Sequence, residues 1–306
     1  MTTRAEPIPD VAPSGIVVVD KPAGLTSHQV VGRARRLLGT RKVGHAGTLD
    51  PMATGVLVLG VGRATRLLGL LSLTDKAYEA TIRLGESTVT DDAEGEVTTA
   101  AGARGLTGDR IEAVLGTLRG TIQQVPSAVS AIKVDGVRSY ARVRSGDEVA
   151  LAARPVTVSR FELRARRDDY AGELPTTDLD VVVECSSGTY VRALARDLGE
   201  ALGAGGHLTA LRRTRVGPFT LAEAQRLDGD ALQVTDISRV ARRCFPALDL
   251  SPELAAAVRV GRRLPDTALS QGESGAPTAL FDPDGTFLAL YRPDVTGAVP
   301  VAVFVG

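Results

Sequence analysis

The sequence lacks the long apolar segments and the clustered cysteines that mark membrane, secreted or zinc-binding proteins. No apolar segment follows Met1 and no uninterrupted apolar run approaches bilayer length, so we expect neither a signal peptide nor a membrane span. Cys185 and Cys244 lie far apart without CxxC spacing, which predicts buried free thiols rather than a disulfide or a zinc site. The three histidines are equally scattered, at His28, His45 and His207. We therefore expect a cytoplasmic protein that holds no metal.

The sequence also lacks net charge, but its charges are unevenly placed. Residues 15–75 hold eight lysines or arginines against three acids, and residues 190–217 hold five arginines against Asp197 and Glu200. Acid concentrates in another segment, residues 91–96 (DDAEGE). Such basic segments make nucleic acid a candidate partner, although solvated helix surfaces carry similar charges in most proteins.

The pattern of apolar residues predicts one α+β protein. Its 306 residues, 43% of them hydrophobic, are enough for one large domain or two smaller ones. Strands interleave with helices without repeated strand–helix–strand units, which favours a mixed, mainly antiparallel sheet with flanking helices. We expect strands at 15–20, 56–60, 76–85, 154–167 and 178–187, a hairpin at 133–138, and helices at 27–38, 63–71, 108–120 and 189–202. The first helix should begin with a capping box formed by Thr26 and Gln29.

Two nucleotide-binding motifs are absent. The segment VLVLGVGRAT (56–65) imitates the start of a dinucleotide fingerprint, but Thr65 stands where the third glycine is needed. No Gly-Lys-Ser/Thr follows these glycines, as a phosphate-binding loop requires. The sequence therefore argues against a nicotinamide or nucleoside triphosphate cofactor.

Asp50 stands in a polar turn, GHAGTLDPMATGVLVLG (44–60), that leads directly into an apolar strand. An Asp-Pro pair is typical of a helix start, with the aspartate as N-cap and the proline at the first helical position. A carboxylate at this place could also bind a metal or attack a substrate. The residues of the turn alone leave these alternatives open.

Four longer segments resemble, in order and spacing, the TruB family of tRNA pseudouridine synthases. They are DKPAGLTSHQVV (20–31), GHAGTLDPMATGVLVLGVGRATRLL (44–68), DKAYEATIRLG (75–85) and CSSGTYVRALARDLG (185–199). The resemblance covers nearly the whole chain. It implies an enzyme that isomerises uridine to pseudouridine in the T-loop of tRNA, at the position conventionally numbered 55, after flipping the base out of its stack.

The resemblance implies that Asp50 is the catalytic aspartate. It also implies that no cofactor is required, because the reaction replaces the bond between N1 and C1′ by a bond between C5 and C1′ without net redox or hydrolysis. The carboxylate serves either as a nucleophile on the sugar or as a base at C2′, and the sequence does not choose between them. Tyr78 matches the aromatic residue that stacks on the target base and helps to remove the C5 proton. Arg192 matches the arginine that pairs with the catalytic carboxylate. Core packing for Tyr78 and an exposed helix position for Arg192 are the simpler alternatives.

Further matches place other residues around the substrate. Tyr190 and Leu211 match residues that line the uracil pocket, and either could instead be ordinary core. His45 matches a residue that holds the flipped nucleotide. Lys21 and Pro22 belong to a loop shared among pseudouridine synthases, where the proline shapes the turn beneath the site.

The resemblance also implies two domains and an RNA partner. Residues 1–245 would form the catalytic domain and residues 246–306 a small β-rich PUA-like RNA-binding module, for which a merely stabilising cap is the alternative. Residues of about 125–146 stand where the family has a basic RNA-clasping insertion, but Val129 and the run from Ser139 to Ala141 depart from its pattern. The expected partner is the T-arm of tRNA, with no membrane and no obligatory protein partner indicated. A tRNA-folding helper is the alternative function.

Overall fold

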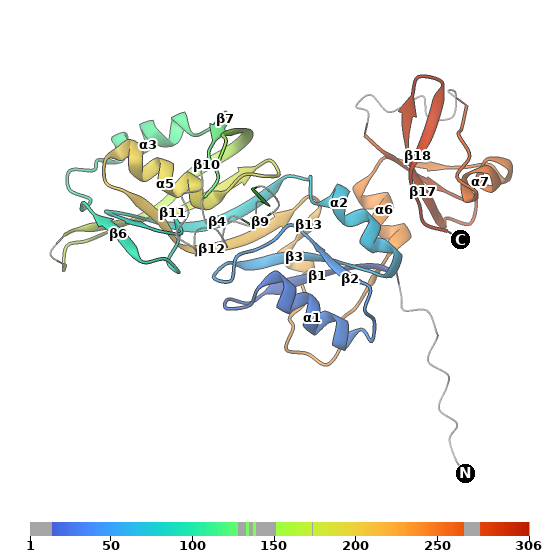
Figure 1. The fold of residues 1–306 in the computed structure, drawn as a ribbon, viewed down its shortest axis with the longest axis horizontal. Coiled ribbons are helices and arrows are strands. Elements are labelled where there is room, and N and C mark those ends of the chain that lie inside the picture. Colours follow the sequence, from blue (N-terminus) through green and yellow to red (C-terminus); the bar gives the residue numbers. More distant parts are fainter. Residues whose placement is uncertain are drawn as a thin grey trace, which may run out of the picture.

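A computed structural model describes residues 14–127, 133–134, 137–138, 151–172, 174–265 and 276–305 (Figure 1). Its main feature is a ten-stranded sheet with the order β14-β1-β3-β12-β4-β11-β10-β7, extended by β2 on β3 and β13 on β12. Every neighbouring pair is antiparallel except β12 with β3. The mixed, mainly antiparallel sheet is therefore confirmed. The strands are β1 (Gly15–Lys21), β2 (Val43–Ala46), β3 (Thr54–Val61), β4 (Lys76–Leu84), β7 (Gly120–Gln124), β10 (Arg154–Asp169), β11 (Thr176–Cys185), β12 (Gly206–Val216), β13 (Phe219–Thr220) and β14 (Thr235–Asp236).

Strands β1 and β3 are buried on both faces, which explains their nearly continuous apolar sequences. Val17 and Val19 of β1 join one apolar cluster with the helices, whereas Ile16 and Val18 face a second cluster. Three helices contribute to the first cluster: α1 (Ser27–Leu37), α3 (Gly108–Thr117) and α5 (Val191–Leu202). Figure 1 shows α3 and α5 over the part of the sheet that contains β4, β10 and β11.

The C-terminal strands form a second, four-stranded sheet in the order β15-β16-β17-β18. Its aromatic side chains Phe281, Phe287 and Phe304 share the second apolar cluster with Ile16 and Val18 of β1. One continuous core thus joins this sheet to the rest of the chain, so its removal would expose apolar surface on both parts. The elements are α6 (Ile237–Cys244), which precedes the sheet, β15 (Ala247–Asp249), α7 (Pro252–Arg259), β16 (Thr278–Phe281), β17 (Phe287–Asp294) and β18 (Gly297–Val303).

Most expected elements are present, with differences that have local causes. The capping box of Thr26 and Gln29 begins α1 as predicted. The single helix expected at 63–71 is instead a 3-10 helix η1 (Gly62–Leu67) followed by one α-helical turn α2 (Leu68–Leu71). Strand β12 occupies the middle of the sheet. The sequence analysis did not assign it, because its arginines and threonines obscure the alternation of its buried residues.

The remaining elements are short. β5 (Glu86–Thr88) pairs with β6 (Val97–Ala100), η2 (Leu221–Glu223) follows β13, and β8 (Lys133–Val134) pairs with β9 (Val137–Arg138) as the hairpin prediction requires. Most of the predicted RNA-clasping insertion lies outside the described residues. No helix in the described part of the chain has the length and apolar character needed to cross a membrane.

Candidate functional site

Residues 47–53, here called the Asp50 loop, connect β2 to β3 without forming a helix. The backbone N–H of Ala53 donates to the carbonyl of Asp50 at 3.1 Å, which closes a single turn. Asp50 is therefore not a helix N-cap, and the interpretation suggested by the Asp-Pro pair is wrong. Its carboxylate is left to make other contacts.

Three buried side chains from different elements hold the backbone of this loop. They are Lys21 at the end of β1, Ser27 at the start of α1 and Arg213 in β12, each no more than 1% exposed. Lys21 donates to the carbonyls of Pro51 (3.1 Å) and Ala53 (2.6 Å), Ser27 to that of Leu49 (3.1 Å), and Arg213 to those of Gly47 (3.0 Å), Thr48 (3.3 Å) and Val56 (2.8 Å). Because buried carbonyls without donors are costly, these bonds fix the loop before any substrate arrives.

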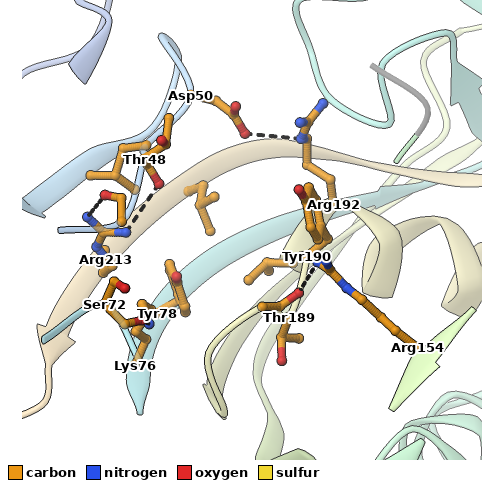
Figure 2. Close-up of a pocket in the computed structure, with 15 residues that line it drawn as sticks. Thr48, Asp50, Ser72, Lys76, Tyr78, Arg154, Thr189, Tyr190, Arg192 and Arg213 are labelled. Atoms are coloured by element: carbon orange, nitrogen blue, oxygen red, sulfur yellow. Dashed lines mark hydrogen bonds and ion pairs between the residues drawn. The ribbon is translucent and has the colours of Figure 1, made fainter. Parts of the chain in front are cut away.

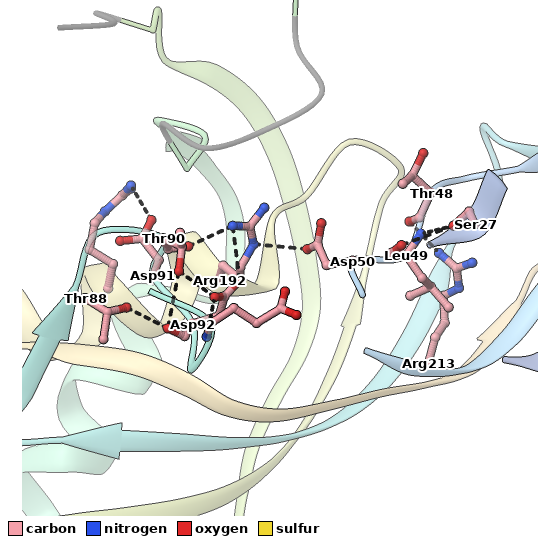
Figure 3. Close-up of polar contacts among 12 residues, drawn as sticks. Ser27, Thr48, Leu49, Asp50, Thr88, Thr90, Asp91, Asp92, Arg192 and Arg213 are labelled. Carbon is pink, nitrogen blue, oxygen red and sulfur yellow. Dashed lines mark hydrogen bonds and ion pairs between the residues drawn. The ribbon is translucent and has the colours of Figure 1, made fainter. Parts of the chain in front are cut away.

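The Asp50 carboxylate pairs with Arg192, the second residue of α5. Nε of Arg192 lies 3.1 Å from Oδ2 of Asp50, and its Nη1 lies 3.2 Å from Oδ2 of Asp92 and donates to the carbonyl of Thr90 at 2.7 Å (Figure 3). The side chains of Arg192 and Asp92 are 6% and 3% exposed, whereas that of Asp50 is 36% exposed. One buried guanidinium thus neutralises a buried carboxylate and orients an accessible one.

The surroundings of Asp50 act on its pKa in opposite directions. Burial raises the pKa and is the largest influence, while the positive charge of Arg192 lowers it and the negative charge of Asp92 raises it. The resulting pKa lies above the ordinary value of an aspartate. Arg192 therefore favours the ionised form without fully compensating for the loss of solvent.

Asp50 opens into a pocket of about 340 Å³ whose lining includes most of the predicted site residues (Figure 2). Tyr78, Tyr190, Arg192 and Leu211 all line it. Asp50 is the only carboxylate among the described residues that line this pocket. Segments separated by up to about 160 positions in the sequence therefore meet around one acidic group.

The pocket walls are rigid because their residues belong to strands or are held by buried bonds. Tyr78 in β4 is 6% exposed, and burial raises the pKa of its phenol. The backbone of Tyr190 donates to Oε1 of Gln124 (2.8 Å) and accepts from Nε2 of the same side chain (3.1 Å). The guanidinium of Arg154 lies 4.9 Å from the centre of the Tyr190 ring.

Two predicted site residues do not line the pocket. Lys21 is fully buried beneath the Asp50 loop, and burial lowers its pKa to about 8. His45 lies in β2 with its ring 5.5 Å from that of His28, and burial lowers its pKa as well. Lys21 supports the loop from below, and an RNA contact by His45 stays a prediction.

Sequence reasoning missed Asp92 and Arg213. The acidic segment 91–96 is separate from the basic segments in the sequence, but in the fold Asp91 and Asp92 pair with arginines of α5. Arg213 could have been found, because it follows Leu211 by two residues in one strand and therefore shares its face. No cluster of histidine, cysteine, aspartate and glutamate suited to a metal occurs among the described residues.

The predicted basic segment 190–217 is not a free basic surface. Arg192 and Arg196 pair with acids of the 88–96 region, and Arg213 is buried against backbone carbonyls. Arg212 pairs with Asp20 and Arg215 with Glu184. The local excess of positive charge is cancelled by acids that are distant in the sequence. Counting charges within residues 190–217 alone does not reveal these pairs.

Comparison with known proteins shows to which family the chain belongs. Residues 35–191 match the model of the TruB family pseudouridylate synthase N-terminal domain. Residues 192–239 match the tRNA pseudouridylate synthase B C-terminal domain, and residues 245–305 the tRNA pseudouridine synthase II C-terminal domain. The chain belongs to the TruB family. It is an enzyme that isomerises uridine to pseudouridine in tRNA.

Similar proteins cover nearly the full chain. The tRNA pseudouridine synthase B of Arthrobacter sp. is 59% identical over 297 residues, which are 95% of this chain and 96% of that protein. That of Nocardia farcinica is 58% identical over 305 residues, 99% of this chain and 95% of that protein. A chain in the crystal structure of a Cbf5-Nop10-Gar1 complex superposes with a TM-score of 0.70 at 25% identity, covering 98% of this chain and 92% of that one. The TruB fold is thus shared beyond close relatives.

Proposed function

We propose that Asp50 acts directly on the ribose of a uridine in the T-loop of tRNA, at the position numbered 55. The observation that carries this proposal is that Asp50 is the only carboxylate lining the pocket in the described part of the chain. The Asp50 loop, held by Lys21, Ser27 and Arg213, gives this group a fixed position. Pre-organisation of this kind removes the cost of ordering a catalytic group during the reaction.

The reaction that Asp50 serves is balanced without a cofactor. The bond between N1 of uracil and C1′ breaks, the uracil turns, a bond between C5 and C1′ forms, and the proton on C5 leaves while N1 gains one. The carboxylate either attacks C1′ or removes a proton from C2′, and both routes need its ionised form beside the ribose. Arg192 maintains that form and directs Oδ2 toward one side of the pocket.

We further propose that the uridine reaches Asp50 by flipping out of the stacked loop. The pocket is concave and semi-enclosed, with Tyr78 and Leu211 supplying apolar surface for a nucleobase. A stacked base cannot present its C1′ to a carboxylate in such a pocket without leaving the stack. Tyr78 replaces part of the lost stacking energy, and Tyr190 and Leu211 complete the walls.

Substitution of Tyr78 separates stacking from proton removal. Tyr78→Phe should slow turnover but leave tRNA affinity close to that of the wild type, because the ring remains. Tyr78→Leu should also weaken affinity, since base–aromatic stacking is worth about 1–3 kcal/mol per base. Single-turnover rates and filter binding with unmodified tRNA measure the two effects. Equal rates and affinities in both variants would assign Tyr78 to the core alone.

The raised pKa of Asp50 predicts the acid side of the pH profile. Activity needs the carboxylate ionised, so the rate should fall on acidification at a higher pH than an aspartate with the ordinary pKa of about 3.9 would allow. Single-turnover rates from about pH 4 to about pH 8 measure this limb, with tRNA binding followed at each pH. A limb at or below the ordinary aspartate pKa would contradict the assignment of burial as the dominant influence.

The domain organisation remains part of the proposal. We assign residues 1–245 to catalysis and residues 246–306 to a PUA-like RNA-binding module, with His45 contacting the flipped nucleotide. Because the C-terminal sheet shares an apolar core with β1, surface substitutions test the module more cleanly than a deletion. Assistance to tRNA folding is compatible with the same contacts, since opening and releasing the T-loop exchanges its native interactions.

A further inference from the structure

Two sets of described lysines and arginines outside the Asp50 pocket differ in their partners. Arginines on β4, β10 and β12 lie within ion-pair distance of carboxylates, as in Arg83–Asp178 (2.8 Å) and Arg212–Asp20 (2.7 Å). These pairs leave little net positive charge on that part of the surface. The second set, Arg41, Lys42 and Arg66 in the segment from α1 to η1, forms no ion pair with a described carboxylate.

Two of the three acids in residues 15–75 form ion pairs with arginines outside that segment. Asp20 pairs with Arg212 of β12, and Asp50 pairs with Arg192 of α5. No carboxylate of the described residues forms an ion pair with Arg41, Lys42 or Arg66. Within the part of the chain that the structure describes, Arg41, Lys42 and Arg66 therefore keep the positive charge that the arginines of residues 190–217 share with acids.

These three cations line, together with Arg63, one pocket of about 400 Å³, here called the basic pocket. Arg41, Lys42, Arg63 and Arg66 line it together with four uncharged residues, and no described carboxylate contributes. The two walls are joined by a bond of 2.8 Å from the N–H of Gly62 to the carbonyl of Lys42. A concave site with four positive charges and no acid fits a polyanion.

Two of the guanidiniums are held in place by the C-terminal sheet. Nη1 of Arg63 donates to the carbonyl of Phe304 at 2.9 Å, and Nη1 of Arg66 donates to that of Val303 at 2.7 Å. The bond of Arg66 uses one of the five N–H groups of its guanidinium, and the planar fork of an arginine suits phosphate oxygens. The C-terminal segment that docks beside η1 therefore positions two of the four cations of the basic pocket.

The basic pocket and Asp50 lie at opposite ends of one hairpin. Val43 pairs with Val61 at the basic end, whereas the Asp50 loop joins β2 to β3 at the other end. Strand β3 separates the ends by roughly 20 Å, at about 3.3 Å per residue. Figure 1 shows β2 and β3 side by side, with α2 and α6 between this hairpin and the C-terminal sheet.

We infer that the basic pocket binds phosphate groups of the tRNA backbone at a distance from the reacting uridine. The inference rests on tRNA being the substrate and adds a contact surface to the proposed site. Phosphates outside the flipped nucleotide position the RNA without reading its bases. Neutralising them releases counterions, so their contribution depends on salt.

The test compares salt dependence of tRNA binding among single and double variants. Each lost phosphate contact should reduce the slope of log affinity against log salt by about 0.7–0.9. The slope of Lys42→Ala should be reduced by one such increment and that of the double variant Arg41→Ala/Lys42→Ala by about two. Both variants should raise KM and leave kcat nearly unchanged. Lys42→Arg should keep the wild-type slope because it keeps the charge. Arg104→Ala is the matched control, since Arg104 is also exposed and has no ion pair among the described residues but does not line the basic pocket.

An unchanged slope in the double variant would overturn the inference, as would an equal loss in Arg104→Ala. A loss in Lys42→Arg as large as in Lys42→Ala would show a packing effect instead of a phosphate contact. Pseudouridine mapping on the wild type reports the proposed function independently. If the slope is unchanged in the double variant but the wild type forms pseudouridine, the basic pocket is rejected and the proposed function stands. If the slopes change as expected but the wild type forms no pseudouridine at position 55, the proposed function is rejected and the basic pocket stands.

Discussion

Asp50→Asn should reduce pseudouridine formation by about a thousandfold or more while tRNA binding stays close to that of the wild type. The amide keeps the size of the side chain and loses the charge that both chemical routes require. The rest of the pocket, including Tyr78 and Leu211, is unchanged and still accepts the uridine. Single-turnover assays with unmodified tRNA and a parallel binding measurement check the two statements.

The same variant should not be less stable than the wild type near neutral pH. The pKa of Asp50 is raised in the folded protein, so the folded state holds its proton more tightly than the unfolded state does. The contribution of Asp50 to stability consequently falls as the pH rises from the ordinary aspartate pKa to the raised pKa of the folded protein. Above that raised pKa the ionised carboxylate costs stability. Asp75→Asn, at an exposed position of the same charge, is the matched control and should retain full activity. Appreciable product from Asp50→Asn would reject the catalytic assignment.

Arg192→Met should lower the free energy of unfolding by about 3–5 kcal/mol and also abolish turnover. The substitution leaves Asp92 buried without its cationic partner, which is the costly half of the change. It also removes the donor that orients Asp50. Chemical denaturation measures the first effect, and the tRNA modification assay measures the second.

A double variant separates the two consequences. Asp92→Asn added to Arg192→Met removes the unpaired buried charge, and its side-chain oxygen can still accept from Thr90 and from the backbone of Glu94, as Oδ1 of Asp92 does. Part of the lost stability should return, whereas activity should not, because Asp50 still lacks Arg192. If the double variant is no more stable than Arg192→Met, the buried pair is not the origin of the loss.

The site combines a fixed backbone with one accessible charge. Three buried donors, Lys21, Ser27 and Arg213, hold the Asp50 loop from β1, α1 and β12, none of which adjoins the loop in the sequence. The loop therefore needs no helix of its own to be rigid. Sequence motifs around Lys21 and Asp50 describe one unit of structure in this fold, although they stand about thirty positions apart.

Local pattern was sufficient for most of the elements. The apolar pattern predicted a strand at 76–85, where β4 forms with Tyr78, Ala80, Ile82 and Leu84 buried, and the box of Thr26 and Gln29 predicted the start of α1. These features depend on neighbours a few residues away. The missed strand β12 carries charged residues whose partners lie on other strands, so its local pattern is ambiguous.

The sequence by itself determined the family, the mixed sheet and the candidates Asp50, Tyr78, Tyr190, Arg192 and Leu211 that line the pocket, because these depend on local periodicity and on long matching segments. Only the tertiary structure decided which charges cancel. Asp92 entered the site through Arg192, and the arginines of residues 190–217 lost their excess charge to distant acids. Ion pairs and buried hydrogen bonds depend on distances across the fold, and spacing along the chain does not specify those distances.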